Sequence, residues 1–112
     1  MAEGTAPRGF VVGESAVFDQ AEYDAYRRLG GPTVVAHGGQ LLYSGSRSEV
    51  LEGARAWQRP VAIAFASVAA AHAWHDSPEY EAAAVQRRKG ARSSIWIAPQ
   101  AGEAPAPPAR PE

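Results

Sequence analysis

The stretch SPEYEAAAVQRR, residues 77–88, has the residue order of a helix start. Ser77 is a suitable N-cap, because its hydroxyl can accept a hydrogen bond from a backbone N–H group of the first turn. Pro78 follows at the first helical position, where its missing N–H has no bond to lose. The residue before a proline is disfavoured in a helical conformation, so this pair separates the new helix from the apolar segment before it. We therefore expect one helix over residues 67–75 and another from Pro78 to about Gly90.

Four segments have the composition of β-strands, with β-branched and aromatic residues bounded by turn residues. The four expected strands are residues 9–18, residues 40–44 continued by 48–53 after a bulge or turn, residues 60–67, and residues 94–98. Residues 54–59 are predicted to form the loop between the second strand and the third.

The helix between the first two strands is predicted from its cap. Asp19 is a suitable N-cap, and Glu22 stands three residues later, as in a capping box. Gly30 and Gly31, followed by Pro32, predict a break, after which Pro32 opens a second helical segment.

The expected elements follow the order β-α-β-β-α-β, and Ser67 caps the first of two helices in the second crossover. That order is the ferredoxin-like pattern, an α+β fold with an antiparallel sheet. The predicted domain covers residues 9–98. Residues 1–8 are small and polar, and residues 99–112 are rich in proline and alanine, so both tails are expected to be disordered.

Composition excludes several classes of function for this chain of 112 residues. The net charge is −1 and lysine and arginine are not clustered, which argues against a nucleic-acid partner. Without cysteine, disulfides and thiolate metal sites are excluded. No apolar run approaches the ~20 residues of a membrane helix, and the N-terminal residues do not resemble a signal peptide. The expectation is a single cytoplasmic domain.

Both faces of the expected sheet are apolar. In the third strand Val61, Ile63 and Phe65 alternate with three alanines at positions 62, 64 and 66. Both crossovers of a ferredoxin-like fold cover the same face, so the other face would be exposed in a monomer. An exposed apolar face of this size marks an interface, which predicts a homodimer with two sheets packed face to face. The alternative is a monomer with short, poorly exposed strands.

Several pieces of the chain, taken in order, resemble a known family. They are AEYDAY, AHGGQLL, EVLEG, RPVAIAF and SPEYEAAAVQRR, and the most specific is SPEY with Arg87 seven residues after its tyrosine. In this order and spacing they resemble the bacterial domain-of-unknown-function family 1330 over residues 9–99. The resemblance implies the fold of a dimeric α/β barrel.

The chain departs from the pattern of that family at three places. Trp57 stands four residues after Gly53, so the loop there is longer than in the family. Ala64 occupies the position of a common glutamate before the strand-three phenylalanine, and Ser44 occupies that of a common arginine. If that glutamate or arginine carries chemistry in relatives, this chain has lost or replaced it.

The resemblance also implies a class of function. Dimeric-barrel proteins include cofactor-free monooxygenases, isomerases, cyclases and lyases that act on small aromatic or polyketide-like molecules, in a cavity between sheet and helices. We therefore expect an enzyme without an organic cofactor that acts by proton transfer on a hydrophobic, oxygenated small molecule, in bacterial secondary metabolism such as antibiotic biosynthesis. The small alanine face of the third strand would leave room for the cavity, or would simply let the helices approach closely.

Five side chains are the leading candidates for the chemistry. His37 or Glu52 would act as base or acid, because their side chains can exchange a proton near neutral pH in a suitable environment. Arg87 and Arg59 would stabilise developing negative charge. Tyr80 lies on the same helix face as Arg87 and would bind substrate with it. The alternatives are structural: a cation at a helix C-terminus for His37, and an ion pair or a backbone contact for Arg87.

The remaining expected substrate contacts are Tyr43, Ser44 and Trp57, with Trp57 covering either a pocket or the dimer seam. His72 and His75 fall on adjacent helical turns, but without a further ligand motif they predict a solvated helix face and no metal site. Two rival functions stay open. One is a binding or interaction module without turnover, and the other is a cofactor-free or heme-dependent oxygenase.

Overall fold

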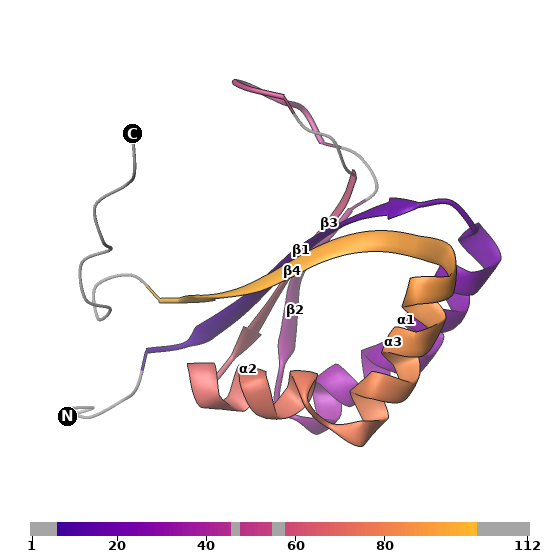
Figure 1. Ribbon diagram of the computed structural model, residues 1–112. Coiled ribbons are helices and arrows are strands. Elements are labelled where there is room, and N and C mark those ends of the chain that lie inside the picture. Colours follow the sequence, from indigo (N-terminus) through magenta and orange to yellow (C-terminus); the bar gives the residue numbers. More distant parts are fainter. Residues whose placement is uncertain (1–6, 46–47, 55–57, 101–112) are drawn as a thin grey trace, which may run out of the picture.

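The computed structural model describes residues 7–45, 48–54 and 58–100 of the chain, and Figure 1 shows their arrangement. Seven elements follow one another in the predicted order. They are β1 (Gly9–Val17), α1 (Gln20–Ala36), β2 (Gln40–Ser44), β3 (Gln58–Phe65), α2 (Val68–His75), α3 (Pro78–Gly90) and β4 (Ala91–Pro99). The β-α-β-β-α-β order with a divided second crossover is therefore confirmed.

The four strands form one antiparallel sheet in the order β2-β3-β1-β4. In Figure 1 all three helices lie on the same side of that sheet. This is the ferredoxin-like α+β architecture, with β2 and β4 as the edge strands. No helix in the described ranges is both long and apolar enough to cross a membrane.

Ser77 joins α2 to α3 through its side chain. Its hydroxyl donates to the carbonyl oxygen of Trp74 at 2.8 Å and accepts from the backbone N–H of Tyr80 at 3.2 Å. Ser67 caps α2 in the same way, accepting from the N–H of Ala70 at 3.0 Å. Both predicted helix starts are therefore confirmed, and the hydroxyl of Ser77 ends one helix while it begins the next.

The predicted break in the first helix is wrong. Helix α1 runs unbroken from Gln20 to Ala36 with Pro32 inside it. Proline removes one backbone hydrogen bond there, but the Thr33 hydroxyl donates to the Gly30 carbonyl at 2.6 Å within the same turn. Packing on one face holds the helix together, because Gly30 and Thr33 are both buried.

Two strand predictions also differ from the structure. Residues 48–54 are exposed and contain bends rather than a continuation of β2. The reason is the pairing, because the β2–β3 register ends where Ser44 faces Val61, leaving residues 48–54 without a strand partner. At the other end of the chain, β4 starts at Ala91 and pairs with β1 along its whole length, so it is longer than expected.

The core lies between the sheet and the helices. Trp74 is at its centre, with its ring centroid 5.4 Å from that of Phe65 and 4.2 Å from that of Tyr80. The Trp74 indole N–H donates to the Thr33 hydroxyl at 2.9 Å, which ties α2 to α1. The residues that form the buried apolar cluster are Val11, Ile63, Phe65, Ala71, Trp74, Tyr80, Ala83 and Ala84.

The strand register shows which face of the sheet meets the helices. Ile63 pairs with Val11 and Leu41, and Ile97 pairs with Val11, so these residues form one row across the helix-covered face. The alanines of β3 therefore lie on the opposite face. The expectation that the alanines face the helices, either to leave room for a cavity or to let the helices approach closely, is wrong. Strand β3 turns its large side chains, Ile63 and Phe65, into the core instead.

The face turned away from the helices is called the outer face here. Two rows of residues cross it from β2 to β4. The first row is Tyr43, Ala62, Val12 and Trp96, and the second row is Gln40, Ala64, Phe10 and Ala98. Trp96 is 46% exposed and Tyr43 is 49% exposed. The expectation that both faces of the sheet are apolar is therefore met.

Candidate functional site

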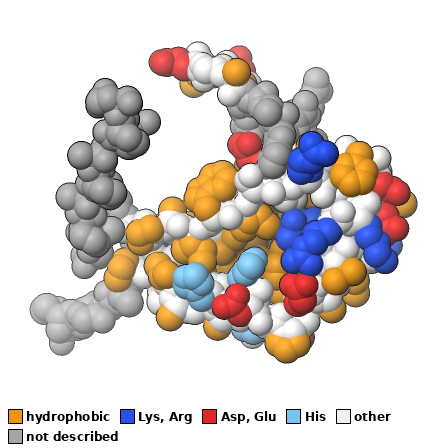
Figure 2. Space-filling model, viewed as in Figure 1, with side chains coloured by type: hydrophobic (Ala, Val, Ile, Leu, Met, Phe, Trp, Pro, Cys, Tyr) orange, Lys and Arg blue, Asp and Glu red, His pale blue; other side chains and the backbone are white. Residues whose placement is uncertain are grey.

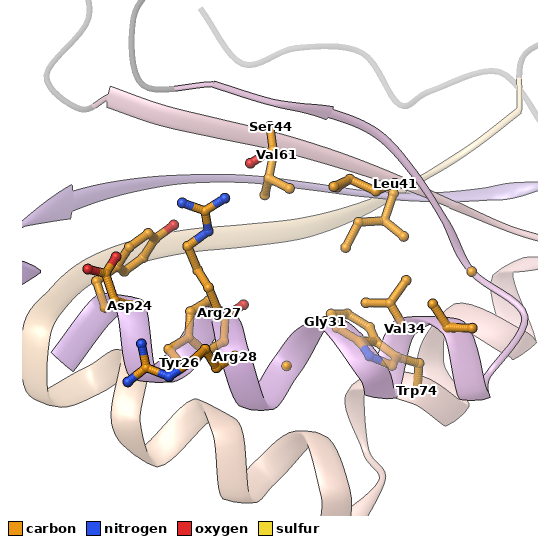
Figure 3. Close-up of a pocket in the computed structure, with 15 residues that line it drawn as sticks. Asp24, Tyr26, Arg27, Arg28, Gly31, Val34, Leu41, Ser44, Val61 and Trp74 are labelled. Carbon is orange, nitrogen blue, oxygen red and sulfur yellow. The ribbon is translucent and has the colours of Figure 1, made fainter. Parts of the chain in front are cut away.

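A cavity of about 590 Å³ lies between α1 and the β2–β3 half of the helix-covered face. Figure 3 shows Leu41, Ser44 and Val61 on the strands across from Gly31 and Val34 on α1. Most of its wall is apolar, formed by Val34, Val35, Leu41, Val61, Ile63 and Trp74. Its polar side chains are those of Tyr23, Asp24, Tyr26, Arg27, Arg28 and Ser44.

Glycines open this space on the helix side. A Cβ atom added at Gly31 would meet no atom within 4 Å, so the missing side chain leaves room in the cavity wall. At Gly39 the reason for glycine differs, because a Cβ there would lie 2.6 Å from the ring of Phe65. One glycine therefore creates space and the other lets the chain pass close to the core.

Three side chains cluster where α1 packs against α3, at the border of the cavity. The hydroxyl groups of Tyr26 and Tyr80 are 3.1 Å apart, and their rings meet edge to face with centroids 6.2 Å apart. The Arg87 guanidinium carbon lies 5.7 Å from the centroid of the Tyr26 ring, within the range of a cation–π contact. Only Tyr26 of the three lines the cavity, so it connects the cluster to the space.

Burial raises the pKa of Tyr26 far above its ordinary value. The neighbouring Tyr80 adds to the rise through its charge when ionised and through the hydrogen bond, whereas the Arg87 cation opposes it. Tyr26 is therefore a neutral phenol at physiological pH and can donate a hydrogen bond into the cavity or to Tyr80.

We expect the Tyr26→Phe variant to lose part of the alkaline sensitivity of folding. The folded pKa of Tyr26 is above the unfolded value of about 10, so the phenol's contribution is complete below pH ~10 and is lost as the pH rises further. Urea unfolding at pH 8 and pH 11 would measure this. At pH 8 the free energy of unfolding of the variant should be about 1 kcal/mol below that of the wild type, because the hydrogen bond to Tyr80 is gone. Between pH 8 and pH 11 the free energy of unfolding should fall less in the variant than in the wild type. An equal loss in both proteins would contradict the buried phenol.

A second arginine borders the same aromatic side chains. The Arg59 guanidinium carbon lies 5.6 Å from the centroid of the Tyr23 ring, and its Nη2 donates to Gln20 Oε1 at 2.6 Å. The Tyr23 and Tyr26 rings are 5.6 Å apart between centroids. Two tyrosines that line the cavity thus stand between Arg59 at one end and Arg87 at the other.

The sequence matches the family model described as "Domain of unknown function (DUF1330)" over residues 8–101. The chain belongs to this family. The resemblance drawn from the SPEY motif and its companions is thereby confirmed. No curated protein matches the sequence of this DUF1330 chain.

Solved structures share the fold of this DUF1330 chain at low sequence identity. The RPA0582 protein of unknown function from Rhodopseudomonas palustris is 22% identical, with a TM-score of 0.68 over 91% of this chain and 85% of that one. SnoaB from Streptomyces nogalater, described as a cofactor-independent oxygenase, is 16% identical, with a TM-score of 0.59 over 96% of this chain and 100% of that one.

A third structure is described as a dimeric protein of unknown function with a ferredoxin-like fold, from Bacteroides fragilis. It is 8% identical, with a TM-score of 0.58 over 82% of this chain and 95% of that one. At these identities the similarities establish the ferredoxin-like fold and nothing finer.

The structure brings some predicted site residues of the DUF1330 chain together. Ser44 lines the cavity, and Arg59, Tyr80 and Arg87 each contact a tyrosine that lines it.

Other predicted residues lie apart from the cavity lining. His37 ends α1, where its Nδ1 is 3.0 Å from the Thr33 carbonyl oxygen. Glu52 is exposed within residues 48–54, and Tyr43 is on the outer face. Trp57 falls outside the described residues, and its role stays a prediction.

Sequence reasoning missed five polar residues of the cavity, all on α1, and Arg28 is one of them. The other four lie in the first two turns of the helix. They are Tyr23, Asp24, Tyr26 and Arg27. The signal that was available is the helical spacing of Tyr23, Tyr26, Gly30 and Val34, which share a face. The predicted break at Gly30 and Gly31 divided that face in two and hid the pattern.

A smaller hollow of about 380 Å³ lies between α2 and β4. In Figure 2 histidine side chains lie beside hydrophobic ones on this side of the molecule. His72 and His75 border the hollow with Trp96 and three aliphatic residues. Within the described ranges, no three His, Cys, Asp or Glu side chains gather closely enough to hold a metal ion.

Proposed function

We propose that this chain is a homodimeric enzyme that binds a hydrophobic, oxygenated small molecule in the cavity beside α1 and catalyses a proton transfer without an organic cofactor. The observation that carries the proposal is the composition of the cavity. A space of about 590 Å³ is within the size range of small-molecule sites, and its apolar wall carries a few polar side chains. An aromatic or polyketide-like molecule has the matching character, with large apolar rings and a few oxygen atoms.

The polar side chains suggest roles in an enolisation. The Asp24 carboxylate would take a proton from a carbon next to a carbonyl group, and the electron pair of the broken C–H bond would move to the carbonyl oxygen. Arg27 and the neutral Tyr26 phenol would stabilise the resulting enolate. Asp24 accepts a hydrogen bond from Gln20 at 2.8 Å, which holds the carboxylate in place. Asp24 takes the place of Glu52 as base because it lines the cavity.

The second copy in this proposal packs against the outer face. That face presents two rows of mainly apolar side chains, with Trp96 about half exposed, and the described helices leave it uncovered. A large exposed apolar face on a small domain is a typical protein interface. The Bacteroides fragilis protein, which shares the fold, is described as dimeric, which supports a dimer of this chain.

An oxygenase that needs no cofactor is the second candidate, because the enolate formed in such a cavity is the electron-rich species that oxygenation requires. SnoaB, whose fold this chain shares, is described as a cofactor-independent oxygenase. The two candidates share the first proton transfer, and oxygen consumption separates them. A binding module without turnover would show neither.

Hydrogen exchange measures the proposed proton transfer without knowledge of the natural substrate. The probe is 2-tetralone in D₂O, and NMR follows the loss of its C1 proton signal with and without protein. We expect protein-dependent exchange that falls by at least ~100-fold in the Asp24→Asn variant, as for loss of a general base. Dissolved oxygen is followed in the same samples.

Three further variants test whether the exchange takes place in the cavity and whether Asp24 is the base. Gly31→Phe places a ring in the cavity wall at a position without neighbours within 4 Å, so it should fold and block exchange. Glu52→Gln and His37→Ala should exchange at the wild-type rate. Exchange that survives Asp24→Asn but fails in one of these two would return the role of base to that residue. Exchange unaffected by Gly31→Phe would overturn the cavity as the site.

A further inference from the structure

Helix α3 carries a largely buried arginine, Arg87, that forms no ion pair with the described residues. Arg87 is only 8% exposed, and its Nε atom is enclosed without a hydrogen-bond partner. It is the one fully buried side-chain nitrogen or oxygen in this condition among the described residues. The acid Glu81 forms its ion pair with Arg88 at 2.9 Å, and Arg87 acts on the Glu81 carboxylate electrostatically without forming an ion pair with it.

A largely buried guanidinium without an ion pair lowers the stability of the folded state, because its enclosed Nε has lost hydration and gained no hydrogen bond in exchange. An apolar side chain of similar length would fill the same space at less cost. Arg87 therefore has the property of a group retained for a ligand that brings the missing negative charge.

The surroundings of Arg87 indicate where that charge would sit. Its guanidinium lies against the ring of Tyr26, which lines the cavity, and the Tyr26 and Tyr80 hydroxyls are within hydrogen-bond distance of each other. The terminal nitrogens of Arg87 form no hydrogen bond with the described residues and, unlike Nε, are not fully enclosed. Three donor groups are thus gathered beside the end of an apolar space.

We propose that Arg87, with Tyr26, forms a carboxylate subsite at the border of the cavity, so that the ligand is a hydrophobic organic anion rather than a neutral molecule. Arginine suits this role because its planar fork of donors matches the two oxygens of a carboxylate. The proposal rests on the proposed function for the existence of the cavity site, and it adds the charge of the substrate class.

The test compares two probes of the same shape, 2-naphthoate and its neutral amide 2-naphthamide, by titration calorimetry at pH 7. We expect the anion to bind the wild type at least ten-fold more tightly than the amide. Arg87→Met should remove that preference and leave amide binding unchanged. Arg88→Met is the matched control, because it removes the neighbouring exposed charge from the same helix and should keep the preference.

Stability supplies a second readout that a purely structural arginine would not give. Without ligand, Arg87→Met should unfold at the same temperature as the wild type or a higher one, because an uncompensated buried charge is removed. If Arg87→Met does not fold, the claim that Arg87 lowers the stability of the ligand-free protein is overturned. Wild-type protein then tests the contact itself, because the Arg87 Nε–H signal in ¹H–¹⁵N NMR should shift with 2-naphthoate and not with 2-naphthamide.

The outcomes distinguish this proposal from the proposed function. Equal affinity for both probes, lost in the Gly31→Phe variant, would overturn the carboxylate subsite and leave the cavity site standing. Binding of neither probe would overturn both. A preference for the anion that persists in Arg87→Met and disappears in Arg88→Met would move the subsite to the exposed surface.

Discussion

Replacing Trp74 by alanine is expected to lower the free energy of unfolding by about 3–5 kcal/mol. The Trp74 side chain is 2% exposed, packs on Phe65 and Tyr80, and donates a hydrogen bond to Thr33. Its removal leaves a large cavity where α1, α2 and the sheet meet, and it leaves the Thr33 hydroxyl without its donor. Chemical unfolding followed by circular dichroism would measure the loss. The total free energy of unfolding of a small domain is about 5–15 kcal/mol, so the variant should be only marginally stable.

Two companion variants separate the causes of that loss. Trp74→Phe keeps an aromatic ring in contact with Phe65 but removes the indole donor, and should cost distinctly less than alanine. Leu51→Ala removes a side chain that is 88% exposed and should change stability by less than about 0.5 kcal/mol. A Trp74→Ala variant as stable as Leu51→Ala would show that α2 does not pack on the sheet as described.

Replacing Val12 by glutamate is expected to convert the protein from dimer to monomer. Val12 lies in the middle of the outer face, between Ala62 and Trp96 in the strand register. In the proposed dimer this substitution would bury a carboxylate without a partner in each copy. Such a charge costs about 3 kcal/mol or more, which weakens association by at least ~100-fold. Sedimentation velocity at micromolar concentration should give a particle of twice the chain mass of 11.8 kDa for the wild type and of one chain for the variant.

Val85→Glu is the matched control for this experiment. It makes the same chemical change at an aliphatic residue that is 45% exposed on α3, in the helical layer away from the outer face. It should leave the dimer intact. A wild-type protein that sediments as a single chain would refute the homodimer, and dissociation by Val85→Glu alone would place the interface on the helices instead.

Local signals in the sequence were enough for the element order. Ser67 and Ser77 are followed by residues that leave few alternatives to a helix start, and the capping bonds involve atoms only three residues apart. The same locality made the family motif readable, because SPEY is itself such a start. The break predicted at Gly30 and Gly31 is absent, because packing of Gly30 and Thr33 against distant parts of the chain outweighed a local preference against helix.

The candidate site was predictable only in part. Ser44, Arg59, Tyr80 and Arg87 were chosen by residue type, and each lies at the cavity or against a tyrosine that lines it. Asp24 was not chosen, because a carboxylate early in a helix is an ordinary surface residue until the strand opposite it is known.

By itself, the sequence determined the order of the elements and the family, because these follow from contacts between neighbours and from spacing along the chain. Alternation also showed that Val61, Ile63 and Phe65 share one side of a strand. Only the tertiary structure decided that this side meets the helices, that α1 stands away from β2 to leave a cavity, and that the Nε atom of Arg87 is buried without a hydrogen-bond partner. The physical reason is that a period of two fixes which residues point together but not toward which layer. That choice belongs to packing between elements distant in the chain.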